Sequence, residues 1–141
     1  FRQGTVHKTY LALCAGRLDR ACAVDAPIAK ERGTRHVVAA DGKAALTHYR
    51  IRERYAGATL IECSLATGRT HQIRVHLASI NHPLVGDPVY GKNNPRLPDF
   101  PRQALHATRL GLVHPLTGLK MQWEVPMPED MRNLLDSLRY G

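Results

Sequence analysis

Apolar and polar residues alternate along several stretches of this chain, and the alternation predicts β-strands. A period of two places successive side chains on opposite faces of a strand, so that one face can be buried while the other meets water. The most regular example puts Leu119, Met121, Trp123 and Val125 on one face. On this criterion we predict strands over residues 6–14, 44–54, 59–65, 105–113 and 119–125.

Segments rich in turn residues separate these strands. Gly57 lies in the link 55–58, and Pro115 and Gly118 lie in the link 114–118, which predicts two hairpin connections. The polar segment 30–43 contains Gly33 and Gly42 and predicts a loop or a hairpin excursion. Residues 16–26 are predicted to be a connection, residues 27–28 begin a short extended piece, and the proline-rich segment 92–101 predicts an extended surface loop.

Helical spacing of apolar residues replaces alternation in the middle of the chain. Ile73, Leu77 and Ile80 recur at this spacing, which predicts a helix over residues 70–80 with a buried stripe. Thr70 is a plausible N-cap, because its hydroxyl can accept from an unpaired N–H of the first turn. Pro83 disfavours a helical conformation in the residue before it, so we expect the helix to end by then.

A second helix is predicted near the C-terminus. Pro128 suits the first helical position, and Glu129 and Asp130 oppose the positive end of the helix dipole. Its apolar stripe consists of Met131, Leu134, Leu135 and Leu138. Together the elements predict an α+β domain with a mostly antiparallel sheet, one helix in the middle and one at the end.

Arg74 lies beside the predicted buried stripe of the first helix, where an arginine needs an anionic partner. One interpretation is a salt bridge that only holds the fold. The other is an arginine that orients a catalytic carboxylate or a phosphate. Its position alone leaves both interpretations open.

The chain has 141 residues and a net charge of +8, with the positive residues spread along its length. This distribution indicates a folded domain with a basic face, and nucleic acid is the favoured acidic partner. A protein that is basic without such a partner is the alternative. The polar segment could follow a phosphate backbone or form a solvated loop; its basic residues are Lys30, Arg32, Arg35, His36 and Lys43.

Other chemistries find little support in the sequence. The three cysteines lack a CxxC spacing, which argues against a disulfide framework or a zinc ribbon and favours a reducing compartment. The eight histidines form no HExxH pattern, so we expect no metal site. The serines lack a nucleophile-elbow context. Without a signal peptide or a long apolar run, we expect no membrane partner and a cytoplasmic location.

The segment 68–91 contains two long motifs, G-R-T-H-Q-I-R-V-H at residues 68–76 and H-P-L-V-G-D-P-V-Y-G at residues 82–91. They resemble the motifs of the ribosomal large-subunit pseudouridine synthases of the RluA/RluD type, subtype D in particular. Supporting matches are K-T-Y-L-A at 8–12, Q-A-L-H-A at 103–107, H-P-L-T-G at 114–118 and P-E-D-M at 128–131. The resemblance covers nearly the whole chain.

This resemblance implies a mixed, mostly antiparallel sheet with flanking helices and the isomerisation of selected uridines in RNA to pseudouridine, without a cofactor. The target base is flipped into a cleft, because its reacting atoms are inaccessible in a stacked helix. A catalytic aspartate attacks or deprotonates the ribose, the glycosidic bond breaks, the uracil turns, and its C5 rejoins the sugar.

The resemblance also implies roles for single residues. Tyr10 matches the active-site tyrosine, which stacks on the target base and is a candidate general base at C5. Arg74 matches the arginine that pairs with the catalytic aspartate. The family's aspartate motif resembles H-R-L-D-x-x-T-S-G, and Asp19 does not fit it, because Arg-Ala-Cys follows Asp19 and the K-x-Y motif precedes it. We therefore expect the nucleophilic aspartate to lie outside this chain.

Weaker assignments concern the remaining motif positions. Arg69, His71 and His76 are candidates for contacting RNA phosphate or framing the cleft. For four further motif positions packing is the expected role: Asp87, Tyr90, Leu105 and His106.

Two hypotheses follow. In the first, residues 1–141 are the C-terminal part of the catalytic domain of a large-subunit rRNA pseudouridine synthase, inactive without the missing N-terminal part. In the second, the chain is an RNA-binding module without isomerase activity. A sheet that lacks strands would leave an exposed edge, which favours dimerisation or aggregation.

Overall fold

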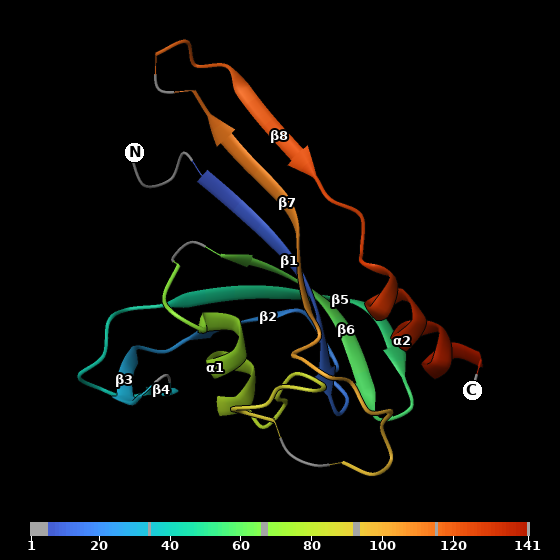
Figure 1. The fold of residues 1–141 in the computed structure, drawn as a ribbon. Coiled ribbons are helices and arrows are strands. Elements are labelled where there is room, and N and C mark those ends of the chain that lie inside the picture. The colour runs from blue at the N-terminus through green and yellow to red at the C-terminus, as the bar shows by residue number, and fades with distance from the viewer. Residues whose placement is uncertain (1–5, 34, 66–67, 92–93, 115, 141) are drawn as a thin grey trace.

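The computed structural model describes residues 6–33, 35–65, 68–91, 94–114 and 116–140. Figure 1 shows the arrangement of the helices and strands in this part of the chain. In chain order they are β1 (Val6–Ala15), β2 (Cys22–Asp25), β3 (Ile28–Arg32), β4 (Arg35–Val38), β5 (Leu46–Tyr55), β6 (Ala58–Leu65), α1 (Gln72–Ser79), β7 (Leu105–Val113), β8 (Lys120–Glu124) and α2 (Glu129–Tyr140).

Six strands form one sheet in the order β2-β5-β6-β1-β7-β8, and β3 and β4 form a separate two-stranded sheet. Every pairing within the described ranges is antiparallel. The predicted α+β class is confirmed, and five strands lie close to their predicted bounds. The polar segment 30–43 forms a hairpin, one of the two predicted alternatives. The prediction that residues 16–26 are a connection was wrong for Cys22–Asp25, which form β2.

Different helices cover the two faces of the large sheet. Helix α1 packs Ile73 and Leu77 into a core that includes Ala12. Helix α2 packs its predicted stripe, led by Met131, into a second core that includes Leu13. Successive side chains of a strand point to opposite faces, so neighbouring residues of β1 belong to different cores. In Figure 1 the two helices accordingly lie on either side of β1 and β6.

Helix α1 begins later than predicted, and Thr70 does not cap it. The N-cap is His71, which has a left-handed backbone (φ 55°) and makes no side-chain cap hydrogen bond. Instead, Gln72 Oε1 accepts from the Arg69 N–H at 3.0 Å, while the Gln72 N–H donates to the Arg69 carbonyl at 3.1 Å. This reciprocal contact orders the turn that carries Arg69.

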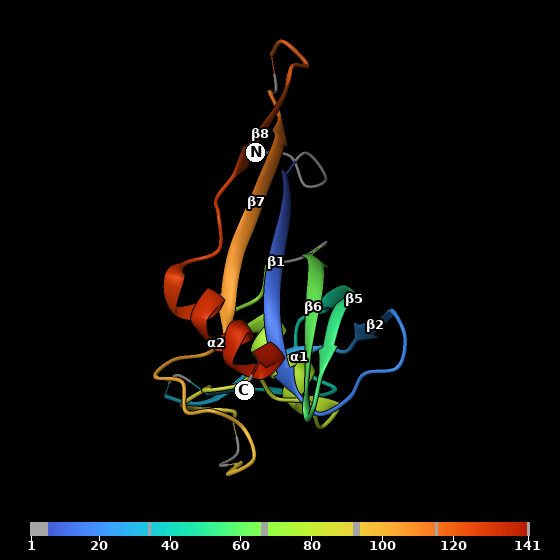
Figure 2. The same cartoon turned by 90° about the vertical axis from the view of Figure 1, so that its right-hand side faces the viewer.

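Strands β7 and β8 extend beyond the helices as a narrow arm together with the start of β1, as Figures 1 and 2 show. β8 is one of the two edge strands of the sheet, and β2 is the other. Trp123 pairs with Leu110, and Leu110 pairs with Lys8, so Trp123 lies on the same face of the sheet as Lys8. This face is exposed on the arm: Trp123 is 48% exposed and Val125 53%.

Candidate active site

A cavity of about 270 Å³ lies where β1 and β7 approach the start of α1. Lys8 and Tyr10 reach it from β1, while Arg69, His71 and Arg74 come from the turn at residues 68–71 and from α1. Its remaining lining residues are Leu65, Gly68, Gln72, Ile73, Gln103 and Leu105. The structure thus brings together four of the residues predicted for the site.

Arg74 forms a buried ion pair with Asp87. Its Nε donates to Asp87 Oδ2 at 2.8 Å and its Nη2 donates to Oδ1 at 2.9 Å, while Oδ1 also accepts from the N–H groups of Val89 (2.9 Å) and Tyr90 (3.1 Å). The side chains of Arg74 and Asp87 are 10% and 0% exposed. The expected anionic partner therefore exists, and it is a motif residue for which only packing was expected.

The ion pair fixes the charges of both partners. Burial by itself raises the pKa of Asp87, but the hydrogen bonds from Arg74, Tyr90 and Val89 outweigh burial and hold this pKa below its ordinary value. The bond to Asp87 likewise raises the pKa of Arg74. Both groups are charged near neutral pH, so the guanidinium at the cavity wall is held in one orientation.

His71 lies at the cavity wall among other rings. Its Nδ1 is 3.0 Å from the Tyr90 hydroxyl oxygen, and its ring meets the rings of Tyr90 and His36 edge-on, with centroids 5.7 and 5.5 Å apart. Burial, helped by the nearby charge of Arg74, lowers the pKa of His71. A histidine with a lowered pKa is neutral near pH 7. It can therefore offer a ligand in the cavity a hydrogen bond but no charge.

The structure corrects the prediction that His76 contacts RNA phosphate or frames the cleft, since it does not line the cavity. His76 is 0% exposed, and both ring nitrogens are used inside the protein. Its Nε2 lies 2.8 Å from the carbonyl oxygen of Ala26, so it must donate there, and Nδ1 then accepts from Thr47 Oγ1 at 2.8 Å. The Thr47 hydroxyl accepts in turn from Gln72 Nε2 at 3.0 Å. Burial also lowers the pKa of His76. His76 joins α1 to β5 and to the end of β2.

A second cavity, of about 440 Å³, adjoins the first and shares Gly68 and Arg69 with it. It lies between the β3–β4 hairpin and the turn at residues 68–70. Arg69 is anchored here, since its Nε donates to the Ala44 carbonyl at 2.8 Å. The other polar side chains around this cavity are Lys30, His36, Asp41, Lys43 and Thr70. A mostly basic surface therefore continues from the first cavity towards the hairpin.

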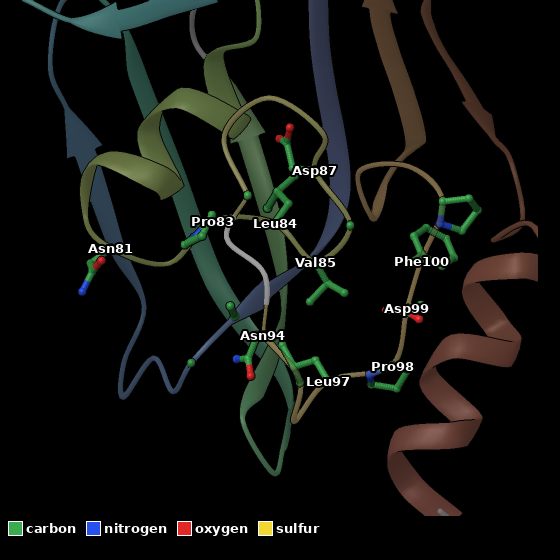
Figure 3. Close-up of a pocket in the computed structure, with 15 residues that line it drawn as sticks. Asn81, Pro83, Leu84, Val85, Asp87, Asn94, Leu97, Pro98, Asp99 and Phe100 are labelled. Atoms are coloured by element: carbon green, nitrogen blue, oxygen red, sulfur yellow. The ribbon is translucent and has the colours of Figure 1, made fainter.

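A larger cavity of about 840 Å³ lies between residues 81–87 and 94–101 and is shown in Figure 3. Asp87 stands at the end of this cavity that is far from Leu97 and Pro98. Among the described residues that line it, the charged ones are Asp87 and Asp99. The smaller cavity at Tyr10 is lined by Lys8, Arg69 and Arg74, and these positive charges make it the better candidate for binding a polyanion.

Within the described residues, no group of three or more histidine, cysteine, aspartate or glutamate side chains could hold a metal ion. The two described helices are too short and too polar to cross a membrane.

Comparison with known proteins now adds to this geometry. The family profile for RNA pseudouridylate synthase matches residues 1–79. The chain is 51% identical over 146 residues to the ribosomal large subunit pseudouridine synthase D of Nitrosomonas europaea, covering 98% of this chain and 42% of the relative. It is 45% identical over 148 residues to the ribosomal large subunit pseudouridine synthase D of Escherichia coli K12, covering 95% of this chain and 45% of that protein.

A solved structure agrees with the sequence comparison. The human RNA pseudouridylate synthase domain containing 1 superimposes with a TM-score of 0.71 at 26% identity, covering 97% of this chain and 67% of that one. The chain spans less than half the length of the two curated relatives.

Proposed function

This chain belongs to the RNA pseudouridylate synthase family, and from that premise we propose that it forms part of an enzyme that isomerises uridines in large-subunit ribosomal RNA to pseudouridine. The observation that carries the proposal is the cavity where Tyr10 meets Arg69, His71 and Arg74. An aromatic ring, a fixed guanidinium and a neutral imidazole there could hold a planar base and a neighbouring phosphate. We also propose that this enzyme acts in the cytoplasm.

In this proposal Tyr10 contacts the uracil. A tyrosine ring offers a flat face on which a flipped-out base can stack, and RNA-binding proteins use aromatic side chains in this way. Its phenol can then exchange a proton at C5 of the uracil. Lys8 lies two residues before Tyr10 in β1 and lines the same cavity, to which it adds a positive charge.

Arg74 orients the catalytic carboxylate in this proposal. Asp87 takes the N–H of Nε and one N–H of Nη2, so a second carboxylate could approach end-on and accept from Nη1 and from the second N–H of Nη2. Asp19 is unsuited to this role for two reasons. It follows the C-terminal end of β1, away from Tyr10, and its exposed carboxylate accepts from Arg17 Nε at 3.0 Å. We propose that the carboxylate comes from a part of the enzyme outside the described residues.

The RNA backbone is proposed to run from the Tyr10 cavity to the adjoining basic cavity. Arg69 lies between the two, and Lys30 and Lys43 lie on the hairpin side. Contacts of these side chains with phosphates would help to offset the free-energy cost of unstacking the target base, which is roughly a few kcal/mol. Such contacts weaken as salt is added.

The test is an assay of the longer enzyme that contains this chain, on unmodified large-subunit rRNA labelled with tritium at C5 of uracil. Isomerisation replaces that atom and releases tritium. We expect the wild type to release tritium, whereas Tyr10→Phe and Arg74→Lys, which keeps a positive charge opposite Asp87, lose the release but keep their affinity for RNA. Arg139→Ala, on α2 and remote from the cavity, is the matched control.

The same assay separates the two hypotheses. If the wild type binds the RNA tightly but releases no tritium, the chain is an RNA-binding module. If both cavity variants keep full activity, the family assignment stands but the roles proposed for Tyr10 and Arg74 are wrong.

A further inference from the structure

Tyr90 lies where the β3–β4 hairpin meets the candidate active site, and its side chain is buried (7% exposed). The backbone N–H of His36 in β4 donates to the Tyr90 hydroxyl oxygen at 2.8 Å, and the same oxygen is 3.0 Å from His71 Nδ1. A hydroxyl can accept from the amide and donate its own proton to an unprotonated imidazole nitrogen. A single oxygen therefore joins β4 to the N-cap of α1.

Further contacts link Tyr90 and its neighbour Val89 to the same two regions, β4 and helix α1. The Cζ atom of Arg74 lies 5.2 Å from the ring centroid, and the Cζ atom of Arg35 in β4 lies 5.1 Å from it, both within cation–π range. Arg35 Nη1 also donates to the Val89 carbonyl at 2.9 Å. The Tyr90 N–H donates to Asp87, the carboxylate that holds Arg74.

Tyr90 also belongs to the small hydrophobic core against which the hairpin packs. The β3–β4 sheet is separate from the main sheet, and Ile28 at its start shares a small core with Ala45, Val75 and Tyr90. Among the backbone contacts there, Ile28 and Lys43 pair with each other, and each N–H lies 2.9 Å from the carbonyl oxygen of the other residue. A shift of Tyr90 would therefore move the hairpin and disturb Arg74 at the same time.

We propose that Tyr90 is a positioning residue that couples the β3–β4 hairpin to Arg74. A phosphate bound by the exposed side chains of Lys30 or Arg32 would bias the position of the hairpin, and Tyr90 would pass this bias to the Arg74 guanidinium. RNA on the hairpin would thus reinforce, through Tyr90, the orientation that Asp87 already gives the arginine. This inference rests on the proposed function in one respect, namely that the ligand of the hairpin is RNA.

The first test removes only the Tyr90 hydroxyl, in Tyr90→Phe, and needs no RNA. Amide exchange by NMR is expected to speed up at His36 by about fivefold, the effect of losing one neutral hydrogen bond, and the Arg74 Nε–H signal is expected to shift. Tyr55→Phe is the matched control, because the Tyr55 hydroxyl bonds Glu53 instead. Unchanged His36 exchange or an unchanged Arg74 signal in Tyr90→Phe would overturn the proposal.

The second test measures binding of a fluorescent stem–loop RNA from the large subunit by anisotropy. Lys30→Ala is expected to weaken binding about threefold in the wild type, as for one lost phosphate contact, and clearly less in the Tyr90→Phe background. The Tyr55→Phe background should keep the full effect. An equal effect in all three backgrounds would refute the coupling. If the wild type binds no RNA at all, the proposed function fails, while the NMR result still decides whether Tyr90 joins the hairpin to Arg74.

Discussion

Replacing Asp87 by asparagine should destabilise this protein strongly. Asparagine keeps an oxygen that can accept from the N–H groups of Val89 and Tyr90, but it removes the charge that compensates Arg74. The Arg74 side chain is only 10% exposed, so water can replace the lost partner only in part. Breaking a buried ion pair by removing one partner costs about 3 to 5 kcal/mol. Because Arg74 borders a cavity, we expect the lower end of this range.

The size of this effect can be checked by thermal and denaturant unfolding followed by far-UV circular dichroism. For a chain of this length the entropy of unfolding is about 0.3 kcal/mol per degree, so a loss of about 3 kcal/mol lowers the Tm by about 10 °C. Asp130→Asn is the matched control, because Asp130 pairs with Arg102 at the surface, where the side chains are 44% and 36% exposed. Surface ion pairs contribute little to stability.

The effect of Asp87→Asn should also depend on pH. The folded protein holds the pKa of Asp87 below its value in the unfolded chain, so the folded state binds fewer protons. This stabilisation is fully present above the unfolded pKa of about 4 and is lost as pH falls through the folded pKa. The gap in stability between wild type and variant should therefore shrink below about pH 4. A Tm loss no larger than that of Asp130→Asn, or a gap that does not narrow in acid, would refute the reasoning.

Three further predictions concern other parts of the molecule. Burial lowers the pKa of His76, so the free energy of unfolding should fall as pH drops from about 7 to 5, and His76→Gln, measured by urea unfolding, should show a shallower fall. Gly86→Ala should destabilise the protein far more than Gly33→Ala in the same assay, although both glycines have positive φ. A Cβ at Gly86 would lie 2.2 Å from the Arg102 carbonyl oxygen, whereas a Cβ at Gly33 would meet no atom of the described residues within 4 Å. The exposed edge strand β8 should promote self-association, and sedimentation velocity should show less of it in Trp123→Lys; equal association would contradict a role for this face.

The sequence predicted most of the fold because its longer strands and both helices have clear periods. It did not predict β2, which is four residues long and buries only Val24. So short a strand, with one buried side chain, shows no period that separates it from a turn. The start of α1 was misplaced for a similar reason, since a Gln72–Arg69 contact rather than a hydroxyl orders its first turn.

The candidate site was predicted in part. The sequence indicated that Arg74 needs an anionic partner, because it lies beside an apolar stripe. Its partner Asp87 follows the end of the helix, and hydrophobic periodicity does not predict which residue outside a helix meets a residue within it. His76 could have been assigned to the interior, because it lies three residues after Ile73 and one before Leu77, within the same buried stripe. Instead, His76 was assigned to RNA contact or to the cleft because it belongs to the motif at residues 68–76.

The most direct test of the central claim is to locate the uridine on the protein. An RNA stem–loop from the large subunit, with a photoreactive uridine analogue at the modified position, would be cross-linked to the protein and the site mapped by mass spectrometry. We predict cross-links to the cavity around Tyr10, within residues 8–10, 68–74 or 103–105, and their loss when unlabelled RNA competes. Cross-links that map to α2 or to the larger cavity at residues 94–101 would contradict the claim.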